Sequence, residues 1–234
     1  MTKPVHPTFW PALLETRDEA PGVRTFKFKS PEGFRFVPGQ FLMFHFADDP
    51  KTWRAYSLAS SPTKASAWFE VTVGMVGAFS DRLGALKPHE EGGLAVRGPF
   101  GKWVYDGTPH HAVLVCGGTG LTPMRAMCQF KADLGLAGKI SVFYSAKTAA
   151  DLLYAAEYDA WRAAGISVSV RTTRDGGGAR WKASEIAAEA GPDAVFYVCG
   201  PKTLVEEMKA GLAGSGVPAD AVRTEKWGDY TDLF

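Results

Sequence analysis

The chain has 234 residues, which is comfortable for two domains, and 46% of them are hydrophobic, enough to build substantial cores. Its formal net charge is +1, so no general electrostatic field favours nucleic acid or an anionic membrane surface. No stretch approaches the roughly 18 apolar residues of a spanning helix, and the first residues lack the apolar run of a signal peptide. We therefore expect a soluble, cytoplasmic protein that binds neither nucleic acid nor membrane.

The first hundred residues contain short strand-like runs separated by Pro and Gly, with little helical periodicity. This spacing is typical of a small antiparallel barrel or sandwich. The predicted strands are 9–16, 23–29, 41–46, 54–58, 68–73 and 94–97.

After residue 107 the pattern changes, and strands alternate with helices. Such alternation predicts βαβ units and a doubly wound parallel sheet, so we place the domains at 1–107 and 108–234. The predicted strands are 112–115, 140–145, 167–172, 195–199 and 222–225, and the predicted helices are 123–135, 150–164, 184–190 and 203–213.

In the second half an apolar strand runs directly into Gly117, Gly118, Thr119 and Gly120. Glycine lets a ligand approach the backbone, and the start of the next helix favours an anion, which indicates a dinucleotide pyrophosphate. The alternative is that a tight strand-to-helix turn simply requires glycine. A later strand ends similarly in Cys199-Gly200-Pro201. Because parallel strands deliver their carboxyl ends to one edge, we predict a nucleotide crevice with a thiol on its rim.

Metal chemistry has little support in the sequence. Cys116, Cys128 and Cys199 form neither a disulfide framework nor a zinc spacing, and an iron–sulfur cluster takes four thiolates. For His110 and His111 we expect a surface turn rather than a pair of metal ligands. We therefore expect no metal, and redox chemistry that rests on an organic cofactor.

Two patterns in the first half suit a flavin. Arg54 and Tyr56 lie two apart on a predicted strand, so they share one face. An arginine fork suits a phosphate, and the tyrosine ring suits an isoalloxazine, although an exposed Arg-Tyr pair is also commonplace. Downstream, Gly77 precedes Ser80 at a possible helix start. That serine is either an ordinary helix cap or part of a pyrophosphate site.

In this order the motifs resemble those of the ferredoxin-NADP reductase superfamily of flavoproteins, over essentially the whole chain. The resemblance implies an α+β two-domain fold, in which an antiparallel Greek-key β-barrel binds FAD and a doubly wound α/β parallel sheet binds NAD(P)H. The matching segments are Arg54-Ala55-Tyr56-Ser57, Gly77-x-x-Ser80, Arg97-Gly98-Pro99-Phe100-Gly101, Gly117-Gly118-Thr119-Gly120-Leu121-Thr122-Pro123 and Cys199-Gly200-Pro201.

The resemblance also implies roles for single residues. Arg54 binds a flavin phosphate, Tyr56 stacks on the isoalloxazine, and Ser57 lies near the nitrogen that accepts hydride. Ser80 and the backbone after Gly77 hold the pyrophosphate of FAD. Cys199 borders the reacting carbon of the nicotinamide. The remaining implied cofactor contacts are Ala55 and Phe79 for FAD, and Gly118, Thr119, Gly120, Thr122, Pro123, Gly200 and Pro201 for NAD(P)H.

The C-terminal segment after Glu225 resembles the family's last strand, in which an aromatic residue lies near the flavin. Trp227 is the favoured cover of the ring, with Tyr230 and Phe234 as alternatives. Ser57, Cys199 and Trp227 are thus the predicted catalytic residues. Because 74–76 contains no basic residue, FMN instead of FAD stays a minor possibility.

The choice of nucleotide rests on Arg174 and Arg180, which follow the third predicted strand of the second half. Arginine at this place accommodates a 2′-phosphate. Thr173-Arg174 also resembles the Ser/Thr-Arg pair of NADPH-using relatives, although a basic solvated turn with Asp175 beside it is the alternative. NADPH is therefore favoured over NADH.

The resemblance implies an enzyme that takes hydride from NAD(P)H onto FAD. Single electrons then pass to a separate ferredoxin, flavodoxin or haem protein. A flavin or ferric reductase is one alternative. An electron-transfer subunit of a larger complex is the other.

Overall fold

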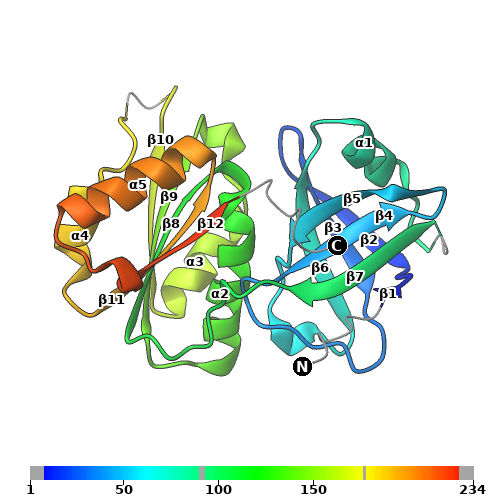
Figure 1. Ribbon diagram of the computed structural model, residues 1–234, viewed down its shortest axis with the longest axis horizontal. Coiled ribbons are helices and arrows are strands. Elements are labelled where there is room, and N and C mark those ends of the chain that lie inside the picture. The colour runs from blue at the N-terminus through cyan, green and yellow to red at the C-terminus, as the bar shows by residue number, and fades with distance from the viewer. Residues whose placement is uncertain (1–7, 90–92, 176–177, 227–234) are drawn as a thin grey trace.

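The computed structural model describes residues 8–89, 93–175 and 178–226, which form two halves side by side (Figure 1). The N-terminal half contains two antiparallel sheets, with strand orders β1-β7-β4-β5 and β2-β3-β6. A bridge between Leu58 and Val71 joins them. The strands are β1 Thr8–Phe9, β2 Leu13–Ala20, β3 Val23–Lys29, β4 Phe41–Phe46, β5 Asp49–Ser57, β6 Trp68–Gly74 and β7 Leu94–Phe100; the helical segments are η1 Pro62–Lys64 and α1 Ala78–Ala85.

These sheets enclose an aromatic core. Phe26, Phe28, Phe44 and Phe69 are fully buried, and the Phe28 and Phe69 rings stack with centroids 5.5 Å apart. In β6, Phe69, Val71 and Val73 point into this core because alternate residues of a strand share a face. The other face of β6 is also buried, yet it carries polar side chains.

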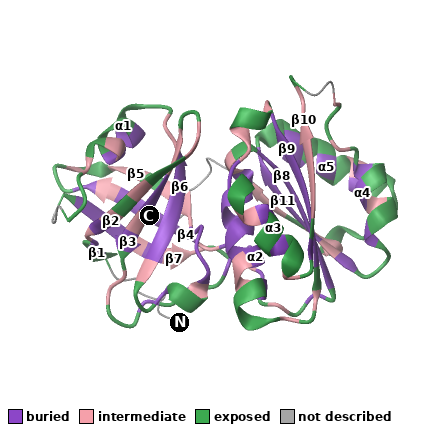
Figure 2. Cartoon of the chain, turned by 180° about the vertical axis from the view of Figure 1, so that it is seen from behind, coloured by how far each residue is buried: buried purple, intermediate pink, exposed green. Residues whose placement is uncertain are grey.

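The C-terminal half is a parallel sheet in the order β10-β9-β8-β11-β12. Every residue of β8 is buried, and Figure 2 shows the central strands in purple. Its strands are β8 His111–Gly117, β9 Lys139–Ala146, β10 Ile166–Thr172, β11 Ala194–Gly200 and β12 Val222–Lys226; its helices are α2 Leu121–Leu134, α3 Tyr158–Ala163, α4 Ala183–Ala190 and α5 Lys202–Gly214, with short 3-10 turns η2 Gly118–Gly120, η3 Ala149–Asp151, η4 Ala155–Glu157 and η5 Ala219–Ala221.

Helices cover both faces of this sheet. One core cluster contains Leu121 and Trp161 from α2 and α3, and another contains Ile186 and Leu204 from α4 and α5. From β8 the chain continues to β9 and β10 on one side, whereas β11 and β12 lie on the other. The strand order therefore reverses between β8 and β11, which is where open α/β sheets bind ligands.

The structure corrects the sequence predictions for 9–16, for 150–164 and for His111. The predicted strand 9–16 is two strands, β1 and β2, separated around Pro11, which has no N–H for a ladder. The predicted helix 150–164 consists of η3, η4 and the short α3, because Tyr154 has a left-handed φ of 57°. His111 is no surface turn residue: it is buried in β8, with its ring nitrogens 2.8 Å from the Ala190 carbonyl and 2.9 Å from the Ser141 hydroxyl.

The predicted domain boundary near residue 107 lies in the segment that links β7 to β8, and it stays a prediction. Among the described residues, none of the helices combines the length and the apolar content that crossing a bilayer requires. The same residues bring together no group of three His, Cys, Asp or Glu side chains suited to a metal ion.

Candidate functional site

A cavity of about 560 Å³ opens between β5 and the start of α1 in the N-terminal half. Arg54 and Tyr56 project into it from one face of β5, as the sequence predicted. The other lining residues are Asp49, Thr52, Gly74, Val76, Gly77, Ala78, Phe79, Ser80 and Arg82.

A flat aromatic surface and a cation form one wall of this cavity. The half-buried Tyr56 ring packs against Phe44 and Phe79, with centroids 5.4 and 6.2 Å apart. Burial raises the pKa of Tyr56 to about 12, so its hydroxyl is neutral at physiological pH. The exposed Arg54 guanidinium lies 5.8 Å from the Phe79 ring centroid. This wall suits a planar ring that carries a phosphate.

The Ser80 side chain stabilises the Gly77 turn at the start of α1. The Ser80 hydroxyl accepts hydrogen bonds from the Val76 and Gly77 N–H groups and donates to the Gly77 carbonyl, at 3.0, 3.1 and 2.8 Å. Ser80 thus caps the start of α1, as one of the two predicted alternatives has it, and its part in a pyrophosphate site stays a prediction. The N–H groups of Ala78 and Phe79 lie in the first turn of α1 and have no acceptor within the helix, so they can donate to an anion.

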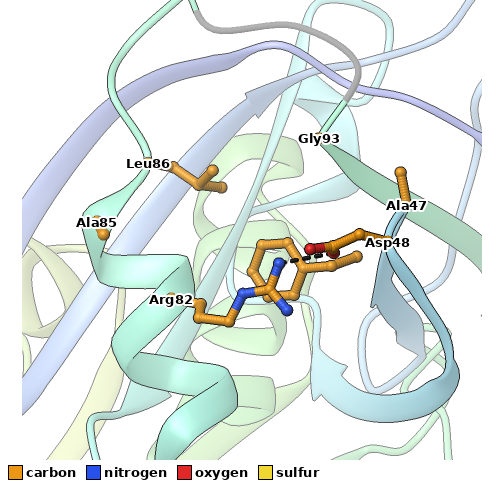
Figure 3. Close-up of a pocket in the computed structure, with 7 residues that line it drawn as sticks. Ala47, Asp48, Arg82, Ala85, Leu86 and Gly93 are labelled. Carbon is orange, nitrogen blue, oxygen red and sulfur yellow. Dashed lines mark hydrogen bonds and ion pairs between the residues drawn. The ribbon is translucent and has the colours of Figure 1, made fainter.

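Arg82 is a cavity residue that the sequence analysis missed. It also lines a second hollow of about 420 Å³ between α1 and the β4–β5 turn (Figure 3). There it forms an ion pair of 2.7 Å with Asp48, and its guanidinium lies 3.9 Å from the Phe46 ring centroid. The hydrogen bond from Arg82 lowers the pKa of the Asp48 carboxyl. The available signal was its position two residues after Ser80.

A cleft of about 420 Å³ lies between the two halves of the protein. Gly118 and Thr119 line it, as does Pro201 at the end of β11, so the two glycine turns predicted to share one edge do so. The remaining lining residues are Ala20, Pro21, Gly22, Val23, Gly74, Met75, Val76, Gly117, Ser145, Ala146, Lys147, Asp151, Leu153, Thr173, Arg180 and Leu204.

The glycines of the β8–α2 loop have different roles. Gly118 has a left-handed φ of 55° and open space where a Cβ would stand, so a ligand can approach its backbone. At Gly120 a Cβ would lie 2.3 Å from the Cys199 carbonyl oxygen. Gly120 therefore allows two protein loops to pack, and the nucleotide contact predicted for it stays a prediction.

Other predicted nucleotide residues lie behind the cleft surface. Thr122, Pro123 and Cys199 are buried, and Cys199 belongs to the core cluster that also contains Tyr197. Ser57 lies half-buried at the end of β5. The catalytic roles of Ser57 and Cys199 stay predictions. Trp227, Tyr230 and Phe234 lie outside the described residues.

Of the two arginines predicted to select NADPH, Arg180 lines the cleft and Arg174 does not. Arg180 lines the cleft together with Thr173, and so does Lys147, which the sequence analysis did not single out. Arg174 is exposed, and its backbone N–H donates to the Lys147 carbonyl at 2.8 Å. The Asp175 carboxylate, predicted as a possible acidic neighbour, accepts from the Ala149 N–H at 2.6 Å and so secures the turn.

The two cavities adjoin, because Gly74 and Val76 line both. An arginine–tyrosine cavity on an antiparallel barrel therefore meets a glycine-lined cleft on a doubly wound sheet. Fold and site together define a two-domain oxidoreductase that pairs a flavin with a nicotinamide nucleotide. Residues 12–105 match the family described as "Oxidoreductase FAD-binding domain", and residues 114–210 match "Oxidoreductase NAD-binding domain". The chain belongs to the ferredoxin-NADP reductase superfamily, as the motifs predicted.

Known relatives agree with this placement. Ferredoxin–NADP reductase B of Sorangium cellulosum strain So ce56 is 28% identical over 92% of this chain and 96% of its own length. A glycine betaine monooxygenase reductase subunit of Pseudomonas aeruginosa is 29% identical over 88% of this chain, which spans only 60% of that protein. The ferredoxin NADP+ reductase of Neisseria gonorrhoeae, solved with bound FAD and NADP, superimposes with a TM-score of 0.79 at 17% identity, covering 93% and 98% of the two chains.

Arg54→Ala is expected to lower FAD affinity about tenfold to a hundredfold, because a charge-assisted phosphate bond contributes about 1.5–3 kcal/mol. The measurement is flavin content after purification, followed by titration of the apoprotein with FAD. Arg35→Ala removes another exposed arginine of the same half and is the control. Equal flavin affinity in the two variants would contradict the role of Arg54.

Proposed function

We propose that this protein is an FAD-dependent reductase that takes hydride from NAD(P)H and passes single electrons to a separate acceptor protein. The observation that carries the proposal is the contact between the two cavities at Gly74 and Val76. Hydride transfer requires two rings in van der Waals contact, and holding them so removes much of the orientational entropy of the reaction.

The cavity residues fit FAD. Tyr56 offers its ring to the isoalloxazine, while Arg54 and the N–H groups at the start of α1 bind phosphate oxygens. At Gly77 the space around a Cβ position is open, so a pyrophosphate can lie against the backbone. When bound, FAD supplies the chemistry that accepts a hydride and releases electrons one at a time.

The cleft residues fit a phosphorylated nucleotide. The Gly118 backbone is accessible, and η2 leads directly into α2, whose N-terminus favours the pyrophosphate. Arg180 and Lys147 add positive charge at the end of the cleft near Thr173. This charge supports NADPH as the preferred donor, because a 2′-phosphate carries negative charge that NADH lacks.

The acceptor we propose is a separate ferredoxin, flavodoxin or haem protein. The names of the relatives support this class, because they include a ferredoxin–NADP reductase and the reductase subunit of a monooxygenase. The test is reduction of the purified holoprotein by NADPH and NADH in a stopped-flow instrument, followed by a panel of acceptors. If neither NADPH nor NADH reduces the flavin, the reductase function is refuted.

Arg180→Ala is expected to raise the KM for NADPH about tenfold or more while changing the KM for NADH little, since the lost charge faces the 2′-phosphate. Arg174→Ala should have a smaller effect in the same direction. Arg162→Ala is the control, because Arg162 is an exposed arginine of the same half that pairs with Asp159 at 2.8 Å and does not line the cleft. A wild type that prefers NADH tenfold would overturn the assignment.

A further inference from the structure

A buried arginine connects the two halves. Arg125 lies on α2, the helix that begins at the glycine loop, and its side chain is only 6% exposed. Its guanidinium lies 2.6 Å from the Glu70 carboxylate on β6 and 2.7 Å from Glu157 in η4. It also donates to the Ala59 carbonyl at 3.2 Å, two residues after the end of β5. One side chain thus links α2 of the nucleotide half to β6 and to the segment that follows β5 in the barrel half.

The partner strand is built for this contact. Glu70 and Thr72 share the face of β6 opposite the aromatic core, and both are buried although they are polar. In Figure 1, α2 lies on the side of the C-terminal half that faces the barrel. Polar groups that are buried between two packed layers must be paired. The element that covers this face of β6 must therefore supply hydrogen-bond or ion-pair partners for Glu70 and Thr72.

A second contact crosses the same interface. Tyr154, the residue with the left-handed φ of 57°, donates its hydroxyl to Thr72 at 2.6 Å. Thr72 in turn bonds Thr25 on β3 at 2.7 Å. The Tyr154 ring lies 4.7 Å from the Arg125 guanidinium. A non-glycine residue held in this conformation is strained, and strain persists where the surroundings over-determine the geometry.

Further polar contacts continue this seam along α2. The Gln129 amide donates to Glu157 at 3.1 Å and accepts from the Ser61 N–H at 3.0 Å. Asp133, one helical turn on, accepts from the Thr63 hydroxyl. Successive turns of α2 therefore contact Ser61 and the adjoining 3-10 turn η1 of the barrel half.

We propose that Arg125, Glu70 and Tyr154 are positioning residues, a buried polar clamp that fixes the nucleotide half against the barrel and thereby sets the spacing between nicotinamide and flavin. This inference rests on the proposed reductase function. Interfaces between domains permit relative motion by default. Buried polar groups that can pair in only one arrangement oppose a shift of one half against the other, because the shift would break those pairs. A displacement of about 1 Å between reacting groups can slow a reaction about a hundredfold, so the clamp acts on the rate rather than on binding.

The first test measures the arrangement of the halves directly. Cysteines introduced at Glu32 and Lys209, which are exposed in the two halves, take spin labels selectively because Cys116, Cys128 and Cys199 are buried. The parent holoprotein is expected to show one narrow distance distribution. Glu70→Gln leaves Arg125 paired with Glu157, and Tyr154→Phe removes only a hydroxyl, so both should fold. Both are expected to broaden the distribution or add a second distance.

The second test separates rate from affinity in stopped-flow reduction by NADPH. Glu70→Gln and Tyr154→Phe are expected to lower the limiting rate of flavin reduction about tenfold, with the dissociation constant of NADPH and the flavin content unchanged within about twofold. Arg17→Gln is the matched control. Arg17 lies 3.7 Å from the same Glu70 carboxylate, but it is on β2 of the same half and its side chain is 42% exposed. It should leave the distances and the rate unchanged.

Narrow, unshifted distances in both clamp variants would overturn the proposal, as would an equal loss of rate in Arg17→Gln. If neither NADPH nor NADH reduces the wild type, the reductase function fails, while the distance measurement still decides whether the clamp holds the two halves.

Discussion

Gly120→Ala is expected to destabilise the C-terminal half by about 3 kcal/mol, a large effect for a single methyl group. The added Cβ would lie 2.3 Å from the Cys199 oxygen, 2.7 Å from the Cys199 carbonyl carbon and 2.9 Å from the Gly200 Cα. All three are backbone atoms, so no side chain can rotate away. The two turns at the switch point must separate, and nucleotide affinity should fall with stability. Urea unfolding followed by tryptophan fluorescence measures the loss.

Gly118→Ala is the matched control two residues earlier in the same loop. Its Cβ meets no atom within 4 Å, and only the left-handed φ of 55° opposes it. We expect a stability loss of about 1 kcal/mol, since a non-glycine residue in this conformation costs about 1–2 kcal/mol. The methyl group stands where a phosphate would approach, so the affinity for NADP+ should fall although the fold survives. Equal losses of stability in the two variants would contradict the different roles of the two glycines.

Much of the fold could be predicted from local patterns. The predicted strands 23–29 and 41–46 coincide with β3 and β4, because short runs of apolar and β-favouring residues end at glycine and proline turns. The change at residue 107 to alternating strands and helices correctly predicted a parallel sheet. Arg54 and Tyr56 reach the same cavity for an equally local reason, the two-residue period of a strand.

What the sequence could not predict depends on contacts between distant segments. Tyr154 sits in a run that favours a helix, and it interrupts that helix because its hydroxyl reaches Thr72 on β6. Glu70 alternates with apolar neighbours, as a solvent-facing strand residue does, yet α2 covers it. Arg125 has the spacing of an ordinary helix residue. Tertiary packing overrides local propensity at such positions, and no pattern within a short window reports it.

The same limit applies to the site. Lys147 follows a predicted strand without any motif, and only the fold brings it beside Arg180 in the cleft. Ser80 and Gly120 show the converse. Both belong to recognisable motifs, and the structure adds a contact that the motif does not report: Ser80 caps the Gly77 turn, and Gly120 packs against the Cys199 carbonyl. A motif thus locates a residue near a site, whereas the contacts that the residue makes within the protein depend on the fold.

Glu225→Gln is expected to remove a pH-dependent loss of stability from the protein. In the wild type, ionisation of Glu225 should lower the free energy of unfolding by about 2 kcal/mol between about pH 5 and pH 8. Glu225 lies on β12 beside Cys199 of β11, where burial raises the pKa of its carboxyl from 4.5 to about 7. Between these two values the folded protein holds a proton that the unfolded chain has released. The contribution of this group to stability is therefore complete below pH 4.5, declines as the pH rises through 7, and is then constant.

The full difference in pKa corresponds to about 3 kcal/mol, and we expect less because the side chain is only partly buried. The amide of glutamine does not titrate. Between pH 5 and pH 8 the variant should therefore lose less unfolding free energy than the wild type loses. Chemical unfolding of both proteins across this range gives the comparison. Glu32→Gln replaces an exposed carboxyl in a turn of the barrel half and should leave the wild-type pH profile unchanged. Parallel profiles for wild type and Glu225→Gln would show that Glu225 is ionised in the folded protein throughout this range, and that burial does not hold its proton.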